Sequence, residues 1–466
     1  MKKGYERPPI VTVLGHVDHG KTTLLDAIRK TNVASKEAGG ITQSIGASVI
    51  TTKDGKRITF IDTPGHAAFS KMRSRGADVA DIAILVVAAE DGVKPQTLEA
   101  LQLIKEAKIP FIVAITKIDL SSADVEGATG QIEKQGILFE GRGGSNPLVK
   151  VSGKTGQGID DLVETISLLS QVSEISGDPK APLAGVVIET QKDKKGPLVS
   201  AIVRGGNLKV GDNISAGDTS TKVRGLFDDR GLPVKEVLPG EPVQILGFSV
   251  LPEIGAKIEI NKKEPSEEEY KKTLPVAKLK KGELGVIVKA ENAGGLEAVL
   301  GNLPPRIVVV DSGIGDIFES DILLAKASGI KRIFAFEVKA SPNVIKLADA
   351  EGVRVEKFEI IYELFQRLQE LVQKGDVEIL GKAEILASFP FNNRKVAGAR
   401  VISGKMAKAD TLILMRGDKE LGKIRAISLK KQKQEIAEAK AGEEFGMIFE
   451  PQLDFAIGDV IVSVRK

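Results

Sequence analysis

The sequence contains no cysteine at all and only three histidines among its 466 residues. Without cysteine there is no disulfide framework, no thiolate nucleophile and no zinc–thiolate site. A reducing, cytoplasmic setting fits that composition. The histidines are His16, His19 and His66. Imidazole chemistry is therefore confined to the start of the chain, and we expect everything after His66 to act by binding.

Long apolar runs and a strong net charge are also missing. The longest uninterrupted apolar stretch, Ile82–Ala89, is far too short for a bilayer, which takes about 20 residues. No long apolar segment follows the basic start, so we expect no secretory signal and no membrane association. The net charge is only +3, which argues against a protein that coats nucleic acid. The length suits about three or four globular domains.

Two parts of the chain alternate strand-like and helix-like patterns. In residues 9–175, short apolar runs rich in β-branched residues are separated by longer amphipathic stretches. Strands alternating with helices of this size imply right-handed crossovers and a mainly parallel sheet. The alternation returns in residues 283–359, and residues 360–375 carry apolar residues at helical spacing. We therefore expect an α/β domain, a small α/β sandwich and a connecting helix.

The remaining segments read differently. Residues 181–262 and 376–466 contain short apolar runs split by glycine turns, a pattern typical of small antiparallel barrels. Residues 263–282 are highly charged and are expected to form a linker, and residues 1–8 a short leader. The predicted fold class is a multidomain α/β plus β protein with two β-barrels.

Residues 15–22 read GHVDHGKT, between a predicted strand and a predicted helix. They satisfy the G-x-x-x-x-G-K-[ST] pattern, whose glycines let backbone N–H groups converge on phosphate oxygens at a helix start. Lys21 is expected to bridge the terminal phosphates and Thr22 to hold Mg²⁺. The alternative, a glycine turn that happens to precede a helix, does not explain the full pattern. The predicted phosphate-binding residues of this loop are Asp18, His19, Gly20, Lys21, Thr22 and Thr23.

A second motif, FIDTPGH, ends another apolar strand at residues 60–66. Asp62 is placed to contact the Mg²⁺ shell through water, and the N–H of Gly65 to meet a terminal phosphate. His66 follows at once, a position suited to aligning a water for in-line attack. Alone, the motif could be a plain turn. Paired with the first loop, it predicts a nucleoside triphosphatase site.

The third motif, ITKID at residues 115–119, identifies the base. A carboxylate only accepts hydrogen bonds; guanine offers N1–H and N2–H₂ on one edge, whereas N1 of adenine is an acceptor. A buried acceptor of this kind can discriminate by roughly four to five powers of ten. Asp119 therefore predicts GTP or GDP as the ligand, bound with Mg²⁺. The predicted guanine-binding residues are Thr116, Lys117 and Asp119, completed by Ser152, Gly153 and Lys154 of the VSGK stretch.

These motifs, together with EAGGITQSIGA (37–47) and the stretch at 60–97, resemble bacterial translation initiation factor 2, a ribosome-associated GTPase. LGVIVKAENAGGLEAVLGNL (284–303) and IIYELFQRL (360–368) resemble the third domain and connecting helix of that family. The resemblance implies a P-loop GTPase domain at 9–175. A β-barrel domain II, a small α/β domain III, a connecting helix and a C-terminal β-barrel would follow.

The resemblance also implies residue roles that composition cannot show. Thr42 would complete Mg²⁺ coordination when GTP is bound, and Val17 and Ile41 would form an apolar gate. His66 would be the catalytic residue, and it would reach its catalytic position only when the protein is bound to the large ribosomal subunit. The family implies a ribosome-dependent GTPase that promotes initiator formylmethionyl-tRNA placement and subunit joining, with GTP hydrolysis triggering release. Both ribosomal subunits and initiator tRNA are the expected partners, and the chain is expected to be a monomer.

The sequence departs from the family pattern at four positions. Thr116 stands where the base-recognition motif usually has asparagine. In the last barrel, Ala399 and Phe445 replace two cysteines, and Lys431 replaces an arginine. Arginine and lysine are not interchangeable at a planar recognition site. The departure at Thr116 concerns the affinity for the nucleotide, and the three departures in the last barrel concern the tRNA pocket.

Charge gives the last barrel an independent link to RNA. Residues 394–433 contain 12 Lys and Arg against 3 Asp and Glu. Such a surface attracts a phosphate backbone, although a solvated barrel face would look the same. No aromatic residue lies between Phe391 and Phe445, so base stacking is not expected. The candidate residues for the tRNA acceptor end are Arg400, Lys430, Lys431 and Lys433.

Two alternatives stay open at this point. One is a tRNA-delivering elongation-type GTPase, against which the second α/β domain argues. The other is a ribosome- or RNA-binding module with little turnover. The presence of Lys21, Thr22, Asp62 and His66 together argues against that module.

Overall fold

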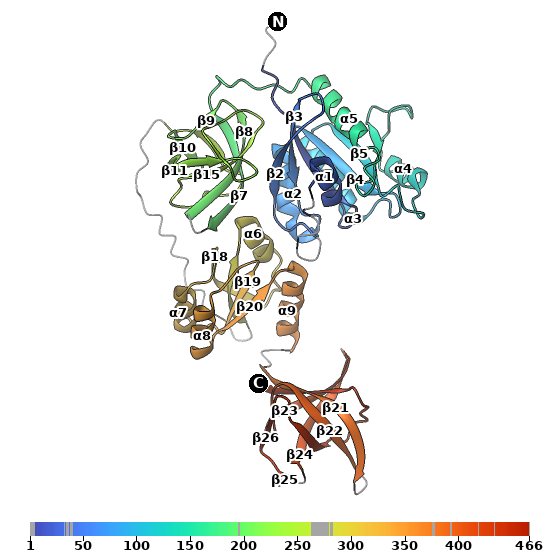
Figure 1. Cartoon of the computed structure of the whole chain (residues 1–466), viewed down its shortest axis with the longest axis vertical. Coiled ribbons are helices and arrows are strands. Elements are labelled where there is room, and N and C mark those ends of the chain that lie inside the picture. Colours follow the sequence, from blue (N-terminus) through green and yellow to red (C-terminus); the bar gives the residue numbers. More distant parts are fainter. Residues whose placement is uncertain are drawn as a thin grey trace. The chain divides into compact units, whose positions relative to one another are not determined.

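The computed structural model describes residues 5–31, 33, 37, 41–193, 196–261, 279, 283–374, 378–391, 394–417, 419–432 and 434–465. The chain forms two compact units, residues 1–366 and 367–466 (Figure 1), and each is described by itself. Apart from Leu279, the predicted linker lies outside the described residues. Within the described ranges, no helix combines the length and the apolar character that a membrane crossing requires.

The first unit opens with a six-stranded sheet in the order β2-β3-β1-β4-β5-β6. All neighbours are parallel except β2 and β3, so the mainly parallel sheet predicted for this region is confirmed. Strand β2 was not predicted, because its sequence GASVIT is only half-buried at the edge and lacks a strong apolar run. The strands are β1 (Ile10–Gly15), β2 (Gly46–Thr51), β3 (Arg57–Asp62), β4 (Ile82–Ala88), β5 (Phe111–Thr116) and β6 (Leu148–Lys150).

Helices cover both faces of this sheet. One apolar cluster joins the sheet to α1 and α5 through Leu24 and Leu162, and another joins it to α3 and α4 through Leu101 and Ile132. Burial on both faces explains why the central strands are continuously apolar. The loops after the strand ends then gather at one edge, where ligands bind in such folds. The helices are α1 (Lys21–Arg29), α2 (Ser70–Val79), α3 (Pro95–Ala107), α4 (Val125–Glu133) and α5 (Ile159–Val172), with a 3₁₀ turn, η2 (Ala67–Phe69).

An antiparallel barrel follows in the same unit, as predicted. Its main sheet has the order β11-β10-β16-β7-β8-β15-β12-β13, and β9 and β14 form a separate pair. Inward residues such as Val187, Val199 and Ile245 form its core. The strands are β7 (Ala184–Asp193), β8 (Gly196–Gly205), β9 (Leu208–Lys209), β10 (Asn213–Ala216), β11 (Thr219–Lys222), β12 (Gly225–Phe227), β13 (Pro233–Val234), β14 (Glu236–Val237), β15 (Pro242–Leu246) and β16 (Lys257–Ile260).

The second α/β region has a four-stranded, fully parallel sheet in the order β18-β17-β19-β20. Helix α9 (Ile361–Lys374) then begins, with Ile361, Leu364 and Leu368 buried at the spacing of an amphipathic helix. The small α/β domain and the connecting helix are therefore as predicted. The other elements are β17 (Leu284–Ala290), α6 (Ala293–Gly301), β18 (Ile307–Ile314), α7 (Glu319–Ala327), β19 (Arg332–Phe336), α8 (Pro342–Ala350) and β20 (Arg354–Phe358).

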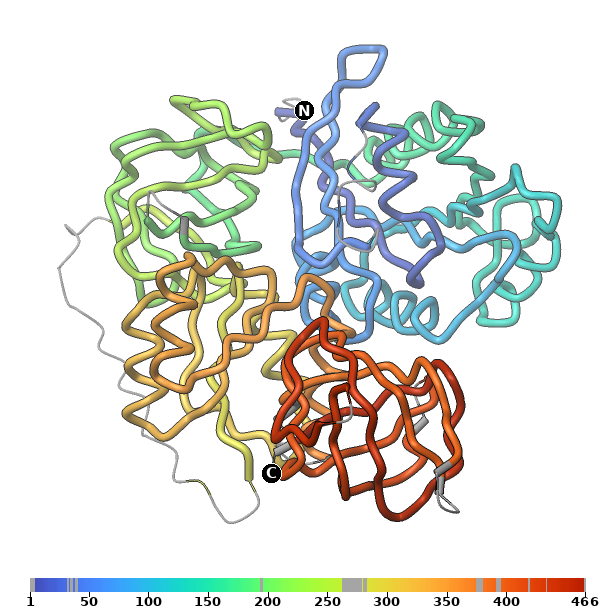
Figure 2. Tube along the Cα trace, turned by 60° about the horizontal axis from the view of Figure 1, so that its bottom comes forward, coloured from blue at the N-terminus to red at the C-terminus, as the bar shows by residue number. Residues whose placement is uncertain are grey.

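The second unit contains the C-terminal barrel. Its strands follow the order β21-β28-β23-β24-β27-β22-β26, and a further pairing of β21 with β22 closes the sheet on itself (Figure 2, orange to red). The strands are β21 (Glu378–Phe391), β22 (Arg394–Ala407), β23 (Thr411–Arg416), β24 (Lys419–Lys431), β25 (Gln434–Glu435), β26 (Glu438–Lys440), β27 (Glu444–Glu450) and β28 (Val460–Arg465).

Candidate nucleotide-binding site

The predicted phosphate loop connects β1 to α1, and its backbone can be built only with glycine at its first position. A Cβ on Gly15 would lie 2.4 Å from the carbonyl oxygen of Val86. Gly20 caps α1 in the left-handed conformation at φ 84°, which favours glycine. The N-terminus of α1 is therefore held open toward the cavity beside it, as anion binding requires.

Lys21 begins α1 and lies almost completely buried beneath the loop. Its Nζ donates to the carbonyl oxygen of His16 at 2.7 Å. Burial lowers the pKa of Lys21 to about 8, while the carboxylate of Asp62 acts in the opposite direction. The ammonium is thus positioned and available to neutralise phosphate charge at the loop.

Three oxygen-bearing side chains meet beside Lys21. The hydroxyl oxygens of Thr22 and Thr42 lie 2.7 Å apart. Asp62 is buried, burial raises its pKa to about 6, and its Oδ1 has no hydrogen-bond partner in the described part of the chain. A buried carboxylate without a partner is costly unless a cation lies beside it. Two hydroxyls and a carboxylate are the hard oxygen donors that Mg²⁺ prefers, so these residues fit the ion.

Glu37 is a carboxylate at this corner that the sequence motifs did not single out. Its Oε2 accepts a hydrogen bond from the hydroxyl of Thr42 at 3.0 Å. Burial raises the pKa of Glu37, and the nearby Asp62 carboxylate acts in the same direction. In the sequence, Glu37 is the first residue of the EAGGITQSIGA stretch that resembles the family, and no role was assigned to it there.

His66 starts the 3₁₀ turn after β3. Its Nδ1 accepts a hydrogen bond from the N–H of Ala68 at 3.1 Å, which caps the turn. Burial lowers the pKa of His66, and the Arg73 guanidinium adds to this effect. Arg73 is itself buried and donates to the carbonyl oxygen of Pro64 at 3.0 Å. Arg73 thus stabilises the backbone of the loop that carries His66.

The base-recognition residues lie after β5 and β6. Asp119 Oδ1 accepts a hydrogen bond from the Ser152 hydroxyl at 2.7 Å, and this bond lowers the pKa of Asp119. Asp119 is therefore ionised at neutral pH, with Ser152 holding its orientation. Lys117 has the positive φ of 58°, and its Nζ lies 2.5 Å from Glu90 Oε1.

Thr116, which lines the cavity, also makes a contact that its position in the base motif does not predict. It is buried, and its hydroxyl donates to the carbonyl oxygen of His19 at 2.6 Å. The shorter side chain therefore ties the base loop to the phosphate loop. Its oxygen is engaged by the protein, so it supplies rigidity at the site.

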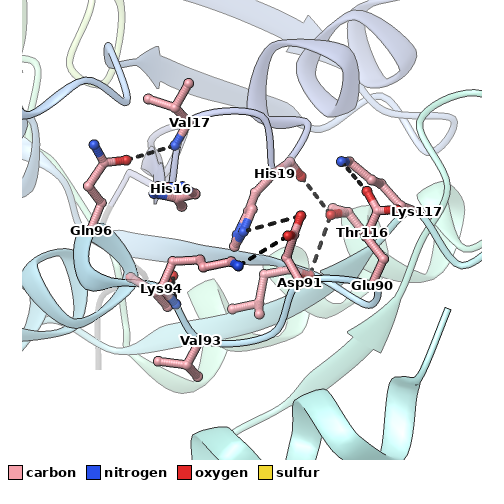
Figure 3. A network of polar contacts seen from close by, with 12 residues as sticks. His16, Val17, His19, Glu90, Asp91, Val93, Lys94, Gln96, Thr116 and Lys117 are labelled. Carbon is pink, nitrogen blue, oxygen red and sulfur yellow. Dashed lines mark hydrogen bonds and ion pairs between the residues drawn. The ribbon is translucent and has the colours of Figure 1, made fainter. Parts of the chain in front are cut away.

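A second layer of contacts supports the phosphate loop from behind (Figure 3). Gln96 Oε1 accepts from the N–H of Val17 at 2.9 Å. The His19 ring is fully buried and its Nε2 lies 4.0 Å from Asp91. Burial lowers the pKa of His19 to about 4, so its ring is neutral. Two of the scarce histidines thus contact each other behind the loop, with ring centroids 4.9 Å apart.

The loops enclose a cavity of about 400 Å³. The predicted residues His19, Ser152 and Asp62 do not line it; the His19 carbonyl oxygen accepts from Thr116 and the Ser152 hydroxyl donates to Asp119, two residues that do. Tyr362 of α9 and Leu120 also line it, and no sequence motif pointed to either. The predicted residues that line the cavity are Val17, Asp18, Gly20, Lys21, Thr22, Thr23, Ile41, Thr42, Gly65, His66, Thr116, Lys117, Asp119, Gly153 and Lys154.

The candidate tRNA residues of the C-terminal barrel occupy neighbouring strands. β27 lies between β22, which carries Arg400, and β24, which carries Lys430 and Lys431. Arg400 Nη2 lies 2.5 Å from Glu444, and Lys431 Nζ lies 2.7 Å from Glu443. Lys430 is exposed, and Lys433 lies outside the described residues. Ala399 and Phe445, which replace the family's cysteines, are both buried in the barrel core.

Six of the 12 Lys and Arg residues at 394–433 are paired with carboxylates from 435–459. Carboxylates from 435–459 approach the basic side chains wherever the register brings the strands together. The printed sequence places these charges far apart, but the barrel pairs them. The ion pairs are Lys395–Asp454, Arg400–Glu444, Lys405–Glu438, Lys408–Glu435, Arg416–Asp459 and Lys431–Glu443.

Comparisons with known proteins agree with this architecture. Residues 6–171 match the family described as Elongation factor Tu GTP binding domain, and residues 182–260 match Elongation factor G domain 2. Residues 245–369 match Translation-initiation factor 2.

Full-length relatives extend the match over nearly the whole chain. Translation initiation factor IF-2 of Caldanaerobacter subterraneus subsp. tengcongensis is 42% identical, covering 98% of this chain and 69% of the relative. The IF-2 of Aquifex aeolicus is 40% identical, covering 98% of this chain and 60% of the relative. The crystal structure of GDP-bound aIF5B from Aeropyrum pernix is 31% identical, covers 98% of this chain and 92% of that chain, and gives a TM-score of 0.45.

The P-loop domain, its guanine motif and the barrel that follows define a translational GTPase, an enzyme that hydrolyses GTP. Within that class, identity of 42% over 98% of the chain decides the family. The chain belongs to the translation initiation factor IF-2 family, the GTPases of translation initiation.

Proposed function

We propose that the chain is a ribosome-dependent GTPase that binds GTP with Mg²⁺ and promotes initiator formylmethionyl-tRNA placement and ribosomal subunit joining. GTP hydrolysis then triggers its release, and the chain acts as a monomer in the cytoplasm. One observation carries this proposal. Two loops distant in sequence bring the buried cation of Lys21 and the oriented carboxylate of Asp119 to one cavity, and a third loop carries the buried Asp62, which interacts with Lys21 and has one oxygen without a partner in the described part of the chain.

The phosphate end of the cavity supports triphosphate binding. Lys21 would bridge the terminal phosphates, and the N–H groups of the loop and of Gly65 would donate to their oxygens. Thr22 and Thr42 would hold Mg²⁺ directly and Asp62 through a water. Bound there, the ion would neutralise phosphate charge. A Cβ on Gly65 would lie 2.4 Å from Lys21 Nζ, so a side chain there would displace the ammonium from its position.

The other end of the cavity supports guanine binding. Asp119, held by Ser152, would accept from N1–H and N2–H₂ of the base, while the stem of Lys117 would lie along the ring. Gly153 allows the backbone to approach closely, since a Cβ there would lie 2.9 Å from the carbonyl oxygen of Thr23.

His66 is the proposed catalytic residue. It lines the cavity with Gly65, and Val17 and Ile41 line the same space as the proposed gate. A water in line with the terminal phosphate would be oriented by the imidazole. The N–H of Ala68 occupies Nδ1, so the proposal assigns the contact with the water to Nε2.

The tRNA role of the last barrel rests on Arg400 on β22 and on Lys430 and Lys431 on β24, the two strands that flank β27. Two of these cations are paired with exposed carboxylates, and such surface pairs are weak. A phosphate backbone could therefore displace the carboxylates at low cost. Lys433 belongs to the same proposal.

The test uses the full chain with ribosomal subunits. Start-site mRNA, small subunits and initiator tRNA, formylated or not, are mixed with large subunits. Subunit joining is followed by light scattering and GTP hydrolysis by phosphate release. We expect GTP and formylated tRNA to accelerate joining, and both subunits together to accelerate hydrolysis. Ribosome binding without stimulated hydrolysis would instead favour the RNA-binding module.

A further inference from the structure

The nucleotide cavity is not built by the GTPase domain alone. Tyr362, in the first turn of α9, lines it together with Asp18 and His66. The rings of Tyr362 and His66 meet edge to face, with centroids 4.1 Å apart and planes at 78°. Aromatic pairs favour this arrangement. An element that follows the second α/β region in sequence therefore contacts the proposed catalytic imidazole.

Gln43 fixes the start of α9. This residue directly follows Thr42 and is buried. Its Oε1 accepts from the N–H of Ile361 at 3.0 Å, and its Nε2 donates to the carbonyl oxygen of Glu359 at 2.6 Å. One amide thus satisfies a backbone donor and a backbone acceptor around the first turn of the helix. The position of Tyr362 is set by the loop that carries Thr42.

The second α/β region receives Gln43 at the carboxyl edge of its parallel sheet. Glu337 and Glu359 directly follow β19 and β20, and Glu337 Oε1 accepts from Gln43 Nε2 at 3.0 Å. Ligands usually bind at this edge in parallel sheets. Glu337 has a φ of 57°, a conformation that a non-glycine residue adopts at a cost. The edge is therefore shaped to hold one side chain of the nucleotide loop.

Two contacts within the protein set the orientation of the His66 ring, and neither of them involves the substrate. One is the N–H of Ala68 on Nδ1, and the other is the Tyr362 ring. Phe69, from the same turn as His66, is farther away at 6.1 Å. A rotation of the imidazole about its side-chain torsions would break its edge-to-face contact with Tyr362. A ring held in this way opposes that rotation.

We propose that Tyr362 is a positioning residue that holds His66 in a resting orientation, and that Gln43 enforces this by pinning the first turn of α9. The inference rests on the proposed function, in which His66 orients the attacking water. Any movement that separates α9 from the loop at Gln43 would free His66. Turnover is then linked to the position of α9.

Selective NMR labelling tests the contact directly, because the chain has three histidines and so gives three ring signals. In full-length protein, Tyr362→Ala should shift the His66 ring signal and leave His16 and His19 in place. Gln43→Ala should shift the same signal. Tyr362→Phe keeps the ring and should leave all three signals close to those of the wild type. Gln366→Ala, at an exposed position on the same helix, is the matched control.

Kinetics test the consequence. Without ribosomes, Tyr362→Ala should raise kcat for GTP hydrolysis roughly 2- to 10-fold, the factor expected for losing one aromatic pair. The readout is kcat at saturating GTP, because Tyr362 also lines the cavity. Tyr362→Phe, which keeps the ring, and Gln366→Ala should give the wild-type kcat. The double variant His66→Ala/Tyr362→Ala should show no increase.

Several results would overturn the inference. An unchanged or lower kcat in Tyr362→Ala would do so. An increase in kcat that persists in His66→Ala/Tyr362→Ala would also do so, and so would a His66 NMR signal that does not shift in Tyr362→Ala. The proposed function fails separately, in the ribosome-stimulated reaction of the single variant His66→Ala. If that variant keeps full stimulated turnover, His66 has no catalytic role and the inference falls with it.

Discussion

At the phosphate end of the nucleotide cavity Lys21 and Asp62 are buried and one Asp62 oxygen lacks a partner in the described part of the chain, whereas the Arg400–Glu444 ion pair of the C-terminal barrel is exposed. Lys21 is 7% exposed, and Asp62 is 5% exposed with one oxygen unpartnered. The Arg400 and Glu444 side chains are 54% and 62% exposed. Burial of unpaired charge is costly and persists where a ligand compensates it.

The difference separates two kinds of binding surface. The cavity is built in advance for one ligand, so single substitutions there should have large effects. The barrel presents a surface whose charges already compensate one another, so each of its residues should matter little. Substitutions in the two regions test this difference, and those in the cavity are expected to have the greater effects.

His66→Ala should give the largest effect on rate. We expect ribosome-stimulated GTP hydrolysis to fall on the order of 10²–10⁴-fold, the range for a positioned acid–base group. GTP affinity should be nearly intact, because the imidazole orients a water and does not hold the nucleotide. Single-turnover hydrolysis on ribosomes, with GTP titration in parallel, measures both quantities. Unaffected stimulated turnover would reduce His66 to a loop residue.

Lys21→Ala should abolish measurable nucleotide binding. Removing one partner of a buried charge interaction typically costs about 3–5 kcal/mol, or roughly 10²–10⁴-fold in affinity. Titration calorimetry with GTP measures the loss, and Lys105→Ala, an exposed lysine on α3, is the control. Equal affinity in the two variants would remove the distinction between cavity and surface charges.

Asp62→Asn should separate stability from binding. Burial raises the pKa of Asp62 to about 6, above the ordinary value near 3.9. The folded protein therefore binds this proton more tightly than the unfolded chain does. Ionised Asp62 costs stability above about pH 6, and the cost disappears as the pH falls from about 6 to 4.

We accordingly expect the nucleotide-free Asp62→Asn variant to be more stable than wild type at pH 8, by roughly 1–3 kcal/mol. Its stability should also vary less between pH 4 and 6, while its affinity for GTP with Mg²⁺ falls. Urea unfolding over this pH range measures the first two effects. Asp78→Asn, at an exposed position on α2, is the control. Parallel pH profiles for wild type and Asp62→Asn would contradict this account.

Thr116→Val tests the tie between the base loop and the phosphate loop. The buried carbonyl of His19 would lose its donor, at a cost of about 1–3 kcal/mol. We expect lower stability in urea and weaker GDP binding, with Thr116→Ser close to wild type because it keeps the hydroxyl. If Thr116→Val binds GDP as tightly as Thr116→Ser, the tie does not organise the loop.

Arg400→Ala should give the smallest effect. Loss of an exposed ion pair should change stability by less than about 1 kcal/mol. If Arg400 contacts an RNA phosphate, the salt dependence of initiator tRNA binding should fall by about one unit of slope. Filter binding over a range of salt concentrations measures it. If Arg400→Ala loses as much stability as Thr116→Val, the exposed ion pair of the barrel is not weaker than the buried contact of the cavity, and the comparison fails.

The phosphate and base loops could be predicted because their chemistry follows from local sequence. Glycine at 15 and 20, lysine at 21 and the carboxylates at 62 and 119 each need a particular backbone or charge at a strand end. The parallel sheet that gathers those ends follows from the alternation of strands and helices. These features require no knowledge of distant contacts.

The remaining features depend on packing between distant segments. Gln43 and Ile361 are 318 positions apart, and no pattern in either segment announces their bond. The hydroxyl of Thr116 reaches a loop 97 positions away. In the barrel, strand register decides which cations meet carboxylates, so a count of charges along the chain overstated the basic surface.

Competition between GTP and ATP for the wild-type site, with Mg²⁺ and a fluorescent GDP reporter, tests the central claim most directly. The account predicts that displacement by ATP requires a concentration higher by roughly 10⁴-fold, because Asp119 accepts hydrogen bonds that adenine cannot donate. Equal displacement by the two nucleotides would contradict it.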